Sequence, residues 1–394
     1  MPELERPPLI QHLAPKNLLS FGPDNPGIEL QALNLLVGPN GSGKSNFIEA
    51  IGLMRAAPKD WRDVTRKGGG VMEWIWKGAP SGTASISATF RDRGAVVPIV
   101  HEMSFRAEEG RFALGHEKLH DKNDCGEGGN EYYWSDAGSA GPMAGRTASD
   151  GEQYLEPAPQ TGDQSILAHL RGPHYPEITW LAEKYEGIRI YREWAFGRNS
   201  VYRAPQRADM RSDVLEEDCS NLGLVLSRLR RTPRAKKAIV AELQNLYAGI
   251  SDFDVSVEGG AVQVFFTEGD YVIPATRLSD GTLRYLCLLA ILCDPEPPPL
   301  ICIEEPELGL HPDILPGVAD LLRVASERTQ LIVTTHSDIL VDAMTETPEC
   351  VVVCEKHDGE TEMSRLSAAE LAVWLEKYRL GDLWIKGQLG GKRW

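Results

Sequence analysis

The sequence predicts an α/β fold that combines a parallel sheet with an antiparallel β part. From residue 279 onward, apolar runs alternate between helical and strand spacing, which is typical of a parallel sheet covered by helices. Nearer the amino end, the strand-like run 33–38 leads directly into a glycine-rich loop, which is followed by the helical spacing of 45–57. Between residues 83 and 119, apolar and polar residues alternate between turn signals, which predicts antiparallel hairpins.

Composition and cysteine usage narrow the class of protein. The 394 residues are 42% hydrophobic and 25% charged, and no apolar run has the length needed to cross a bilayer. The first ten residues lack the cationic start and apolar core of an export signal. Seven cysteines without a Cys-x-x-Cys pair argue for reduced thiols and against a zinc site or a disulfide framework. We therefore expect a cytoplasmic protein with no membrane partner.

The sequence divides into three parts. Residues 1–164 hold the early strands and the glycine-rich loop, residues 165–250 are mainly helical, and residues 251–394 resume strands before the alternating pattern. Within the first part, residues 121–164 are rich in Gly, Ser, Asp and Pro, which predicts an irregular excursion with one short strand at 131–134.

The glycine-rich loop "GPNGSGKS", residues 38–45, has the spacing Gly-x-x-x-x-Gly-Lys-Ser. Glycines let successive N–H groups turn inward on phosphate oxygens, and the following helix adds the positive end of its dipole. Lys44 would reach the β- and γ-phosphates, and Ser45 would ligate Mg²⁺. A chance turn is the alternative, but the flanking strand and helix are the context that a phosphate loop requires. We therefore predict ATP or GTP binding by Gly38, Pro39, Asn40, Gly41, Ser42, Gly43, Lys44, Ser45 and Asn46.

A second motif, "ICIEEPELGLHP", places two glutamates at the end of an apolar run. The carboxyl end of a buried parallel strand is where a phosphate-loop protein holds Mg²⁺ and orients water at the γ-phosphate. We predict that Glu304 belongs to the Mg²⁺ shell and that Glu305 polarises the attacking water. A charged strand end followed by a solvated turn is the alternative, and the phosphate loop makes it the weaker one.

Two further motifs lie on either side of the acidic pair. In "RLSDGTLRYLCLLAILC", residues 277–293, Ser279 or Asp280 could simply cap the helix, but the same free N–H groups make an anion site. Downstream, the strand-like "LIVTTHSDIL" places His336 at a strand end. A lone histidine is more often structural than functional, yet this position is well suited to contact a γ-phosphate.

In this order, the four motifs resemble those of an ABC-type ATPase head of the RecF/SMC branch. Within that branch, the sequence is similar to stand-alone ATPases related to the ATPase half of overcoming-lysogenization-defect nucleases. The resemblance covers residues 16–110 and 250–356. It implies a mixed central sheet with flanking helices, an antiparallel β subdomain, and a helical lid or arm in 165–250.

The resemblance also implies a homodimer that sandwiches two ATP molecules. Ser279 and Gly281 would contact the γ-phosphate held by Lys44 of the partner subunit. Leu308 to His311 would cross the interface, and His336 would sense the γ-phosphate in its own subunit. Lys44, Glu305 and His336 would then be the catalytic residues, with ATP binding closing the dimer and hydrolysis opening it.

Two departures from the family pattern bear on hydrolysis. Glu304 stands where many such ATPases have aspartate, although either carboxylate can bind a magnesium-held water. The glutamine that normally completes the Mg²⁺ shell is absent from residues 66–80. We predict an Mg²⁺-dependent ATPase in prokaryotic DNA maintenance or anti-phage defence, acting with a separately encoded nuclease or other effector. The alternative is an ATP-gated assembly scaffold with little or no hydrolysis. A transporter subunit is disfavoured by the long separation between Lys44 and Ser279.

Some segments keep two interpretations each. The basic stretch 228–237 and the Arg- and aromatic-rich stretch 191–207 could contact a DNA backbone, despite the net charge of −16, or could be a solvated face and packing residues. The carboxyl-terminal stretch 369–394, which reads as one amphipathic helix, could cover the protein's own core or dock a partner. Asp252 and Asp254 form an Asp-x-Asp pair without an acidic companion, so we predict no nuclease activity in this chain.

Overall fold

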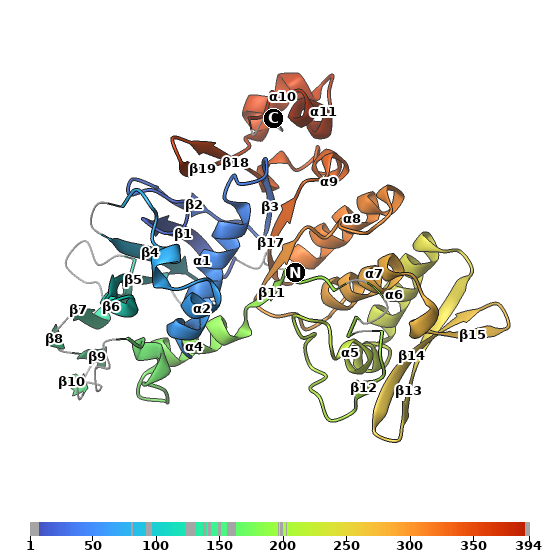
Figure 1. The fold of residues 1–394 in the computed structure, drawn as a ribbon, viewed down its shortest axis with the longest axis horizontal. Coiled ribbons are helices and arrows are strands. Elements are labelled where there is room, and N and C mark those ends of the chain that lie inside the picture. The colour runs from blue at the N-terminus through green and yellow to red at the C-terminus, as the bar shows by residue number, and fades with distance from the viewer. Residues whose placement is uncertain are drawn as a thin grey trace. The chain divides into compact units, whose positions relative to one another are not determined.

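The chain forms two compact units in a computed structural model. The first unit comprises Met1–Ile188, Val352–Leu366 and Leu389–Trp394, and the second comprises Arg189–Val351 and Ser367–Gln388 (Figure 1). The structure describes residues 8–79, 82–91, 97–122, 131–136, 139–140, 143–148, 151–155, 163–195, 197, 200–201 and 203–390.

The first unit is built around an antiparallel sheet with the strand order β2-β1-β4-β5-β6-β7-β8. Its register places Ile86 opposite Met103, and Met103 opposite Glu117. Alternate residues of the strand 83–90, such as Ile86, are buried, as the alternating pattern predicted. The strands are β1 (Ile10–Lys16), β2 (Ile28–Glu29), β4 (Thr83–Phe90), β5 (Ile99–Glu108), β6 (Arg111–Asp121), β7 (Glu131–Asp136) and β8 (Ser139–Ala140).

The excursion 121–164 contains more regular structure than its composition predicts. Strand β7 pairs with β6 and is longer than the expected strand at 131–134. Strands β9 (Met143–Ala148) and β10 (Gly151–Leu155) form an antiparallel hairpin of their own. The prediction of irregular chain was therefore wrong for these residues, because pairing with a neighbouring strand outweighs a composition that favours turns. Residues 123–130, 137–138, 141–142, 149–150 and 156–162 of this excursion lie outside the described ranges.

The glycine-rich loop of the first unit joins a buried strand to a buried helix. All residues of β3 (Leu33–Val37) are buried, and α1 (Lys44–Ala56) buries Phe47, Ile48 and Ile51 at helical spacing. Strands β18 (Val351–His357) and β19 (Glu360–Arg365) form an antiparallel hairpin next to β3 in the sheet order. The remaining helices of the unit are α2 (Trp61–Lys67), α3 (Val71–Trp74), η1 (Ile166–Ala168) and α4 (Pro176–Gly187).

The second unit contains three parallel strands among the described residues. Two of them lie in the alternating pattern that begins at residue 279, and the third, 189–191, lies in the stretch that the sequence predicted to be mainly helical. Strand β16 (Leu300–Glu304) pairs with β11 (Arg189–Tyr191) on one side and β17 (Gln330–Thr335) on the other. Cys302 is therefore opposite both Ile190 and Ile332. The helices between and after these strands are α7 (Asp280–Leu292), α8 (Leu315–Ser326) and α9 (Asp338–Ala343), with short 3-10 turns η2 (Ala275–Arg277), η3 (Pro312–Ile314) and η4 (Pro348–Cys350).

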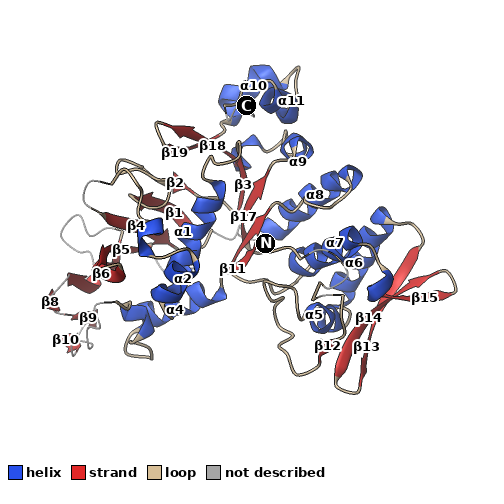
Figure 2. Ribbon diagram, viewed as in Figure 1, coloured by secondary structure: helices blue, strands red, loops and turns tan. Residues whose placement is uncertain are grey.

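A small antiparallel sheet and two helices complete the middle of the second unit. Strand β14 (Ala261–Glu268) pairs with β12 (Gln206–Arg207), β13 (Ile250–Glu258) and β15 (Tyr271–Pro274). Figure 2 shows helices α5 (Leu222–Leu229) and α6 (Pro233–Leu246) beside the β13–β14 ribbon, and both also contact α7. None of the helices in the described ranges is long and apolar enough to span a membrane.

The carboxyl-terminal stretch forms two short helices instead of the single amphipathic helix that the sequence predicts. They are α10 (Ala368–Leu375) and α11 (Leu380–Ile385). Arg379 pairs with Asp342 at 2.6 Å and the Leu380 N–H bonds the Thr345 hydroxyl, and these contacts turn the chain toward α9. Helix α11 buries Trp384, whereas α10 has no buried residue, so only the second helix covers the core.

Candidate functional site

The phosphate loop depends on glycine at its last turn. Gly43 has φ of 99°, a conformation that side-chain-bearing residues rarely adopt. A Cβ atom added there would lie 2.1 Å from Thr361 Oγ1, so steric contact also excludes a larger residue. The glycine spacing that the sequence shows is thus required by the local backbone.

Two buried hydroxyl groups fix the loop from outside its own segment. Thr361 Oγ1 donates to the Ser42 carbonyl at 3.0 Å and shares a hydrogen bond with Ser20 Oγ at 2.7 Å. The Asn46 amide donates to the same Ser20 oxygen at 2.7 Å. Ser20 and Thr361 were missed by the sequence analysis, because neither belongs to a motif and they lie far from the loop in the chain.

Lys44 is buried and folds back over the loop. Its ammonium group donates to the carbonyl oxygens of Gly38 at 2.8 Å and Pro39 at 3.0 Å. The Ser42 hydroxyl is buried, and its oxygen has no hydrogen-bond partner among the described residues. A buried hydroxyl without a partner is costly, and an added phosphate oxygen would supply one. The loop therefore has the donors and the positive charge that a phosphate group needs.

The acidic pair ends strand β16 with a strained residue. Glu304 is the last residue of the strand, and Glu305 adopts φ of 47°, which costs about 1–3 kcal/mol for a residue with a side chain. The Glu305 N–H donates to the Thr334 carbonyl at 3.0 Å, and its carbonyl accepts from Arg284 at 2.5 Å. Tertiary contacts hold this conformation, which turns the Glu305 side chain out of the strand direction.

The second unit brings several predicted site residues together. His336 Nε2 lies 3.8 Å from Glu305 Oε1, so the predicted sensor is next to the predicted water-activating residue. Ser279 caps α7 by accepting from the Thr282 N–H at 3.1 Å. A Cβ atom on Gly281 would lie 2.8 Å from the Gly309 carbonyl oxygen, so the start of α7 touches the turn that contains Leu308 to His311.

A family model described as "AAA domain, putative AbiEii toxin, Type IV TA system" matches residues 33–110 and 190–342, which together are more than half of the chain. The chain belongs to this AAA-domain family. The match includes the phosphate loop, helix α7 with its cap Ser279, the acidic pair and His336. No protein among the curated ones matches the sequence.

Solved structures of SMC heads share the fold of this AAA-domain protein. One is the SmcHead bound to the C-winged helix domain of ScpA, at 16% identity and a TM-score of 0.58, with 92% of this chain and 99% of that chain covered. Another is the Smc head domain with an extended coiled coil bound to the C-terminal domain of ScpA, derived from Pyrococcus furiosus. Its identity is 14% and its TM-score 0.57, over 94% of this chain and 99% of that chain. A third, the Smc head domain with a coiled coil and joint from Pyrococcus yayanosii, has 12% identity and a TM-score of 0.52, covering 94% of this chain and 99% of that chain.

The family match and the fold confirm the predicted resemblance to ABC-type heads of the SMC branch. They identify an AAA domain with the fold of an SMC head. The roles of the individual site residues stay predictions, as does the division into 1–164, 165–250 and 251–394.

In this AAA-domain protein, Arg192 and Trp194 of the stretch 191–207 pack against the acidic strand end. The Trp194 indole N–H donates to the Glu304 carbonyl at 2.8 Å, and Arg192 pairs with the Glu304 carboxylate at 3.3 Å. The Arg284 guanidinium lies 4.4 Å from the centre of the Trp194 ring, a cation–π contact. For these residues, packing is therefore the correct interpretation of the two that the sequence left open.

Arg203, from the same stretch, holds the start of helix α7. Its guanidinium donates to the Leu278 carbonyl at 2.6 Å and to the Asp280 carboxylate at 2.5 Å. The Gly197 N–H also donates to Asp280, at 2.9 Å. The hydrogen bond from Arg203 is the main reason that the pKa of Asp280 lies below its ordinary value. The sequence analysis named Asp280 as a possible helix cap and singled out the stretch that contains Arg203, but it did not pair the two residues, because they lie far apart in the chain.

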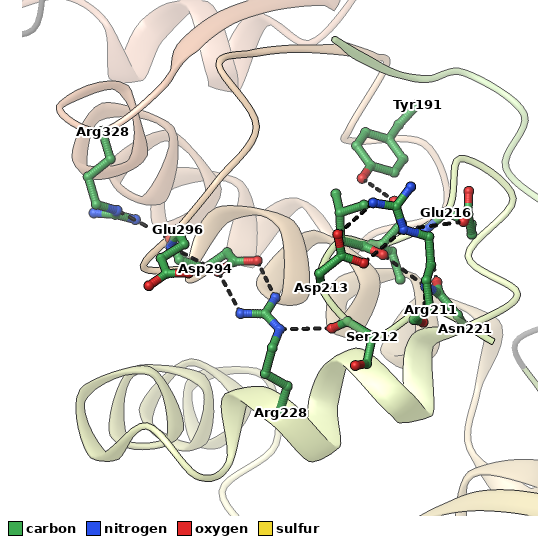
Figure 3. Close-up of polar contacts among 12 residues, drawn as sticks. Tyr191, Arg211, Ser212, Asp213, Glu216, Asn221, Arg228, Asp294, Glu296 and Arg328 are labelled. Atoms are coloured by element: carbon green, nitrogen blue, oxygen red, sulfur yellow. Dashed lines mark hydrogen bonds and ion pairs between the residues drawn. The ribbon is translucent and has the colours of Figure 1, made fainter. Parts of the chain in front are cut away.

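Half of the basic stretch 228–237 is paired with acidic residues. Arg228 donates to both carboxylate oxygens of Asp294, at 3.1 and 2.5 Å, and to the Ser212 carbonyl at 2.8 Å (Figure 3). Arg230 and Lys236 form ion pairs with Asp254 and Asp252, respectively. The Asp-x-Asp pair therefore faces cations. Three basic side chains of the stretch are exposed: Arg231, Arg234 and Lys237.

Proposed function

We propose that the chain binds ATP with Mg²⁺, hydrolyses the ATP, and couples the cycle to closure and opening of a homodimer. The observation that carries this proposal is the strained backbone of Glu305 beside His336. Strained residues are retained where the surrounding structure and the function both require them. Here the strain turns a carboxylate toward the histidine at the end of the neighbouring strand.

Binding of ATP would depend on the phosphate loop. The N–H groups of residues 38–45, the Lys44 ammonium and the start of α1 would surround the β- and γ-phosphates. Lys44 already lies against the loop carbonyls of Gly38 and Pro39, so a short change of side-chain torsions would move its charge to a phosphate oxygen. This pre-organisation reduces the entropy cost of binding.

The hydroxyl of Ser45 and the carboxylate of Glu304 would hold Mg²⁺. Both are oxygen donors, which this hard cation prefers, and Ser45 is exposed at the start of α1. When bound, the ion would neutralise charge that develops on the transferred phosphoryl group. Arg192 would move away from the Glu304 carboxylate or share it, because their ion pair occupies the same oxygen.

Hydrolysis would use Glu305 and His336. The Glu305 side chain is about 42% exposed, so its carboxylate can accept a hydrogen bond from water and orient it toward the γ-phosphate. His336 would donate to the γ-phosphate of the same subunit. The bound phosphate would draw His336 away from Glu305, and its release would let the two side chains approach again.

Dimer closure would use Ser279, Gly281 and the turn from Leu308 to His311. The Leu308 side chain is 46% exposed, and the Gly281–Gly309 contact ties the turn to the start of α7. The resemblance and the family support a place in prokaryotic DNA maintenance or anti-phage defence with a separately encoded effector. Two of the SMC heads with the same fold were solved with a bound ScpA domain, which supports a protein partner for this chain as well.

An ATP-gated assembly scaffold is the second candidate. It is favoured by one observation, the absence of glutamine from residues 66–80, where the family places a Mg²⁺ ligand. In that case nucleotide binding would still close the dimer, but phosphate release would be very slow.

Steady-state phosphate release by wild type and Glu305→Gln separates the two candidates. We expect the variant to be at least about 100-fold slower, the loss typical of a removed general base. Equal rates would reject the hydrolysis proposal. Size-exclusion chromatography of Glu305→Gln with and without ATP tests dimer closure, and a monomer under both conditions would reject the sandwich.

A further inference from the structure

Glu307 is a third carboxylate in the turn after β16, and its side chain points inward. Its Oε1 atom accepts from the Thr335 hydroxyl at 2.7 Å and from the His336 backbone N–H at 2.8 Å. Its Oε2 atom is buried and has no hydrogen-bond partner among the described residues. One oxygen is therefore bonded twice while the other has no donor.

Burying a carboxylate in this way costs folding free energy, which a purely structural role does not explain. Burial raises the pKa of Glu307, and the two donors on Oε1 offset only part of that effect. A buried polar atom without a partner costs about 1–3 kcal/mol, so an apolar residue would be the less costly choice for packing alone. A carboxylate retained at such a cost points to a requirement for its accepting oxygen.

The two bonds of Glu307 join the predicted sensor to the turn. His336 has its backbone fixed by Glu307 and its imidazole 3.8 Å from Glu305. Thr335 donates to Glu307 and accepts from the Ser337 N–H at 2.9 Å, and Ser337 caps α9. The start of α9 and the end of β17 are thus held by one side chain.

The other end of Glu307 belongs to the turn itself. The Leu308 N–H donates to the Glu305 carbonyl at 3.1 Å, and the Leu310 N–H donates to the Glu307 carbonyl at 3.0 Å. Any displacement of His336 that pulls on Oε1 would act on the middle of this turn, where Leu308 is exposed.

We propose that Glu307 is a positioning residue that holds His336 against Glu305 and links the γ-phosphate sensor to the turn from Leu308 to His311. The inference rests on the proposed function for its catalytic consequence. Glu307 does not touch ATP; it acts through the placement of His336. Misplacement of a catalytic group by about 1 Å can lower turnover about 100-fold without weakening substrate binding.

Kinetics of Glu307→Ala and Glu307→Gln test the role in turnover. The alanine variant should lower kcat about 10- to 100-fold and leave KM and the affinity for a fluorescent ATP analogue within about twofold. The glutamine variant should stay within about threefold of wild type, because its amide oxygen accepts the same two hydrogen bonds. A glutamine variant as slow as the alanine variant would overturn the proposal. Glu327→Ala, an exposed acidic residue at the end of α8, is the matched control.

A double-mutant cycle with His336 separates positioning from a general loss of structure. Glu307→Ala combined with His336→Ala should be no slower than His336→Ala alone, because both changes remove the same group from its place. If the decrease in kcat of the double variant equals the product of the decreases in the two single variants, Glu307 acts independently of His336 and the proposal is wrong.

Amide hydrogen exchange of His336 tests the contact without any ATPase activity. Exchange should be at least about tenfold faster in Glu307→Ala than in wild type, and close to wild type in Glu307→Gln. Unchanged exchange in the alanine variant would overturn the proposal, even if wild type hydrolyses ATP. If wild type releases no phosphate, the proposed function fails while this measurement still decides on Glu307. Should the alanine variant not fold, Thr335→Val, which removes one donor, must also accelerate exchange, and unchanged exchange there would be equally decisive.

Discussion

Replacing Arg228 by methionine tests whether the basic stretch is structural. Arg228 lies in α5 and donates two hydrogen bonds to Asp294 and one to the Ser212 carbonyl. Only 4% of the Asp294 side chain is exposed, compared with 27% for Arg228. Methionine keeps the aliphatic stem of the side chain but removes every donor, so the carboxylate stays buried without its cation.

The contacts of Asp294 set the expected magnitude. Removing one partner of a buried ion pair costs about 3–5 kcal/mol, because the remaining charge is uncompensated. The Glu296 N–H still donates to Asp294 at 3.0 Å, and water can reach the partly exposed position that Arg228 leaves. We therefore expect the lower end, about 3 kcal/mol of unfolding free energy. For a unit of this size, that loss corresponds to about 6–12 °C in Tm.

Thermal unfolding followed by calorimetry at pH 7 measures the loss. Arg231→Met is the control, since Arg231 is exposed and its replacement should change the unfolding free energy by no more than about 0.5 kcal/mol. Adding Asp294→Asn to Arg228→Met removes the unpaired charge, so the double variant should recover most of the lost stability.

A different pair of results would refute this reasoning. If Arg228→Met unfolds within about 0.5 kcal/mol of wild type but binds duplex DNA more weakly in a salt-dependent way, then Arg228 serves a phosphate backbone and its pairing with Asp294 contributes little.

Three further changes test the loop, the start of α7 and the charge pairs. Gly43→Ala should abolish binding of a fluorescent ATP analogue, because its Cβ would collide with Thr361 at 2.1 Å; affinity within about threefold of wild type would contradict this. Arg203→Met should weaken ATP-dependent dimerisation at least about tenfold in sedimentation experiments, with ATP binding to the monomer unchanged, because the start of α7 loses its charged donor. Glu102 raises the pKa of His120 above its ordinary 6.5 and His120 lowers the pKa of Glu102 below its ordinary 4.5, mainly through their ion pair, in which His120 Nε2 lies 3.9 Å from Glu102 Oε2. The pair therefore stabilises the fold fully between pH 4.5 and pH 6.5, the ordinary pKa values of the two groups. This stabilisation is lost as the pH rises through the raised pKa of His120, and also as the pH falls through the lowered pKa of Glu102. Glu102→Gln should accordingly lower Tm more at about pH 5.5 than at about pH 8.5, and an equal loss at both would exclude the pair as the cause.

The local motifs could be predicted because each of them is defined by residues that are consecutive in the sequence. The phosphate loop needs only its glycines, Lys44 and the flanking elements, and the adjacent carboxylates at 304 and 305 needed only an apolar run before them. The contacts that support these motifs come from distant residues. Thr361 carries no signal in the sequence. The stretch with Trp194 and Arg203 was singled out, but its partners were not, because a tryptophan and an arginine can make many kinds of contact and the fold decides which residues they meet.

Two structural predictions were wrong for a similar reason. The strands β7 to β10 lie in a stretch whose composition favours turns, and pairing with other strands is a tertiary effect that composition does not contain. The carboxyl-terminal stretch is divided into two helices where Arg379 forms an ion pair with Asp342 and the Leu380 N–H donates to the Thr345 hydroxyl. Periodicity shows the apolar face of a segment, but it does not show where a long-range contact bends the chain.

The anchoring of Trp194 and Arg203 also sets how much the chain can change in length. The Trp194 indole N–H donates to the Glu304 carbonyl, and the Arg203 guanidinium donates to the Leu278 carbonyl just before α7. Gly197 lies between Trp194 and Arg203 and its N–H donates to Asp280, so an insertion in this span should weaken at least one of these three contacts. The hairpin tip at Gly259 and Gly260 is the opposite case, since a Cβ there would meet nothing within 4 Å. A peptide tag or a fluorescent label belongs at that tip, where added length leaves the anchored contacts intact.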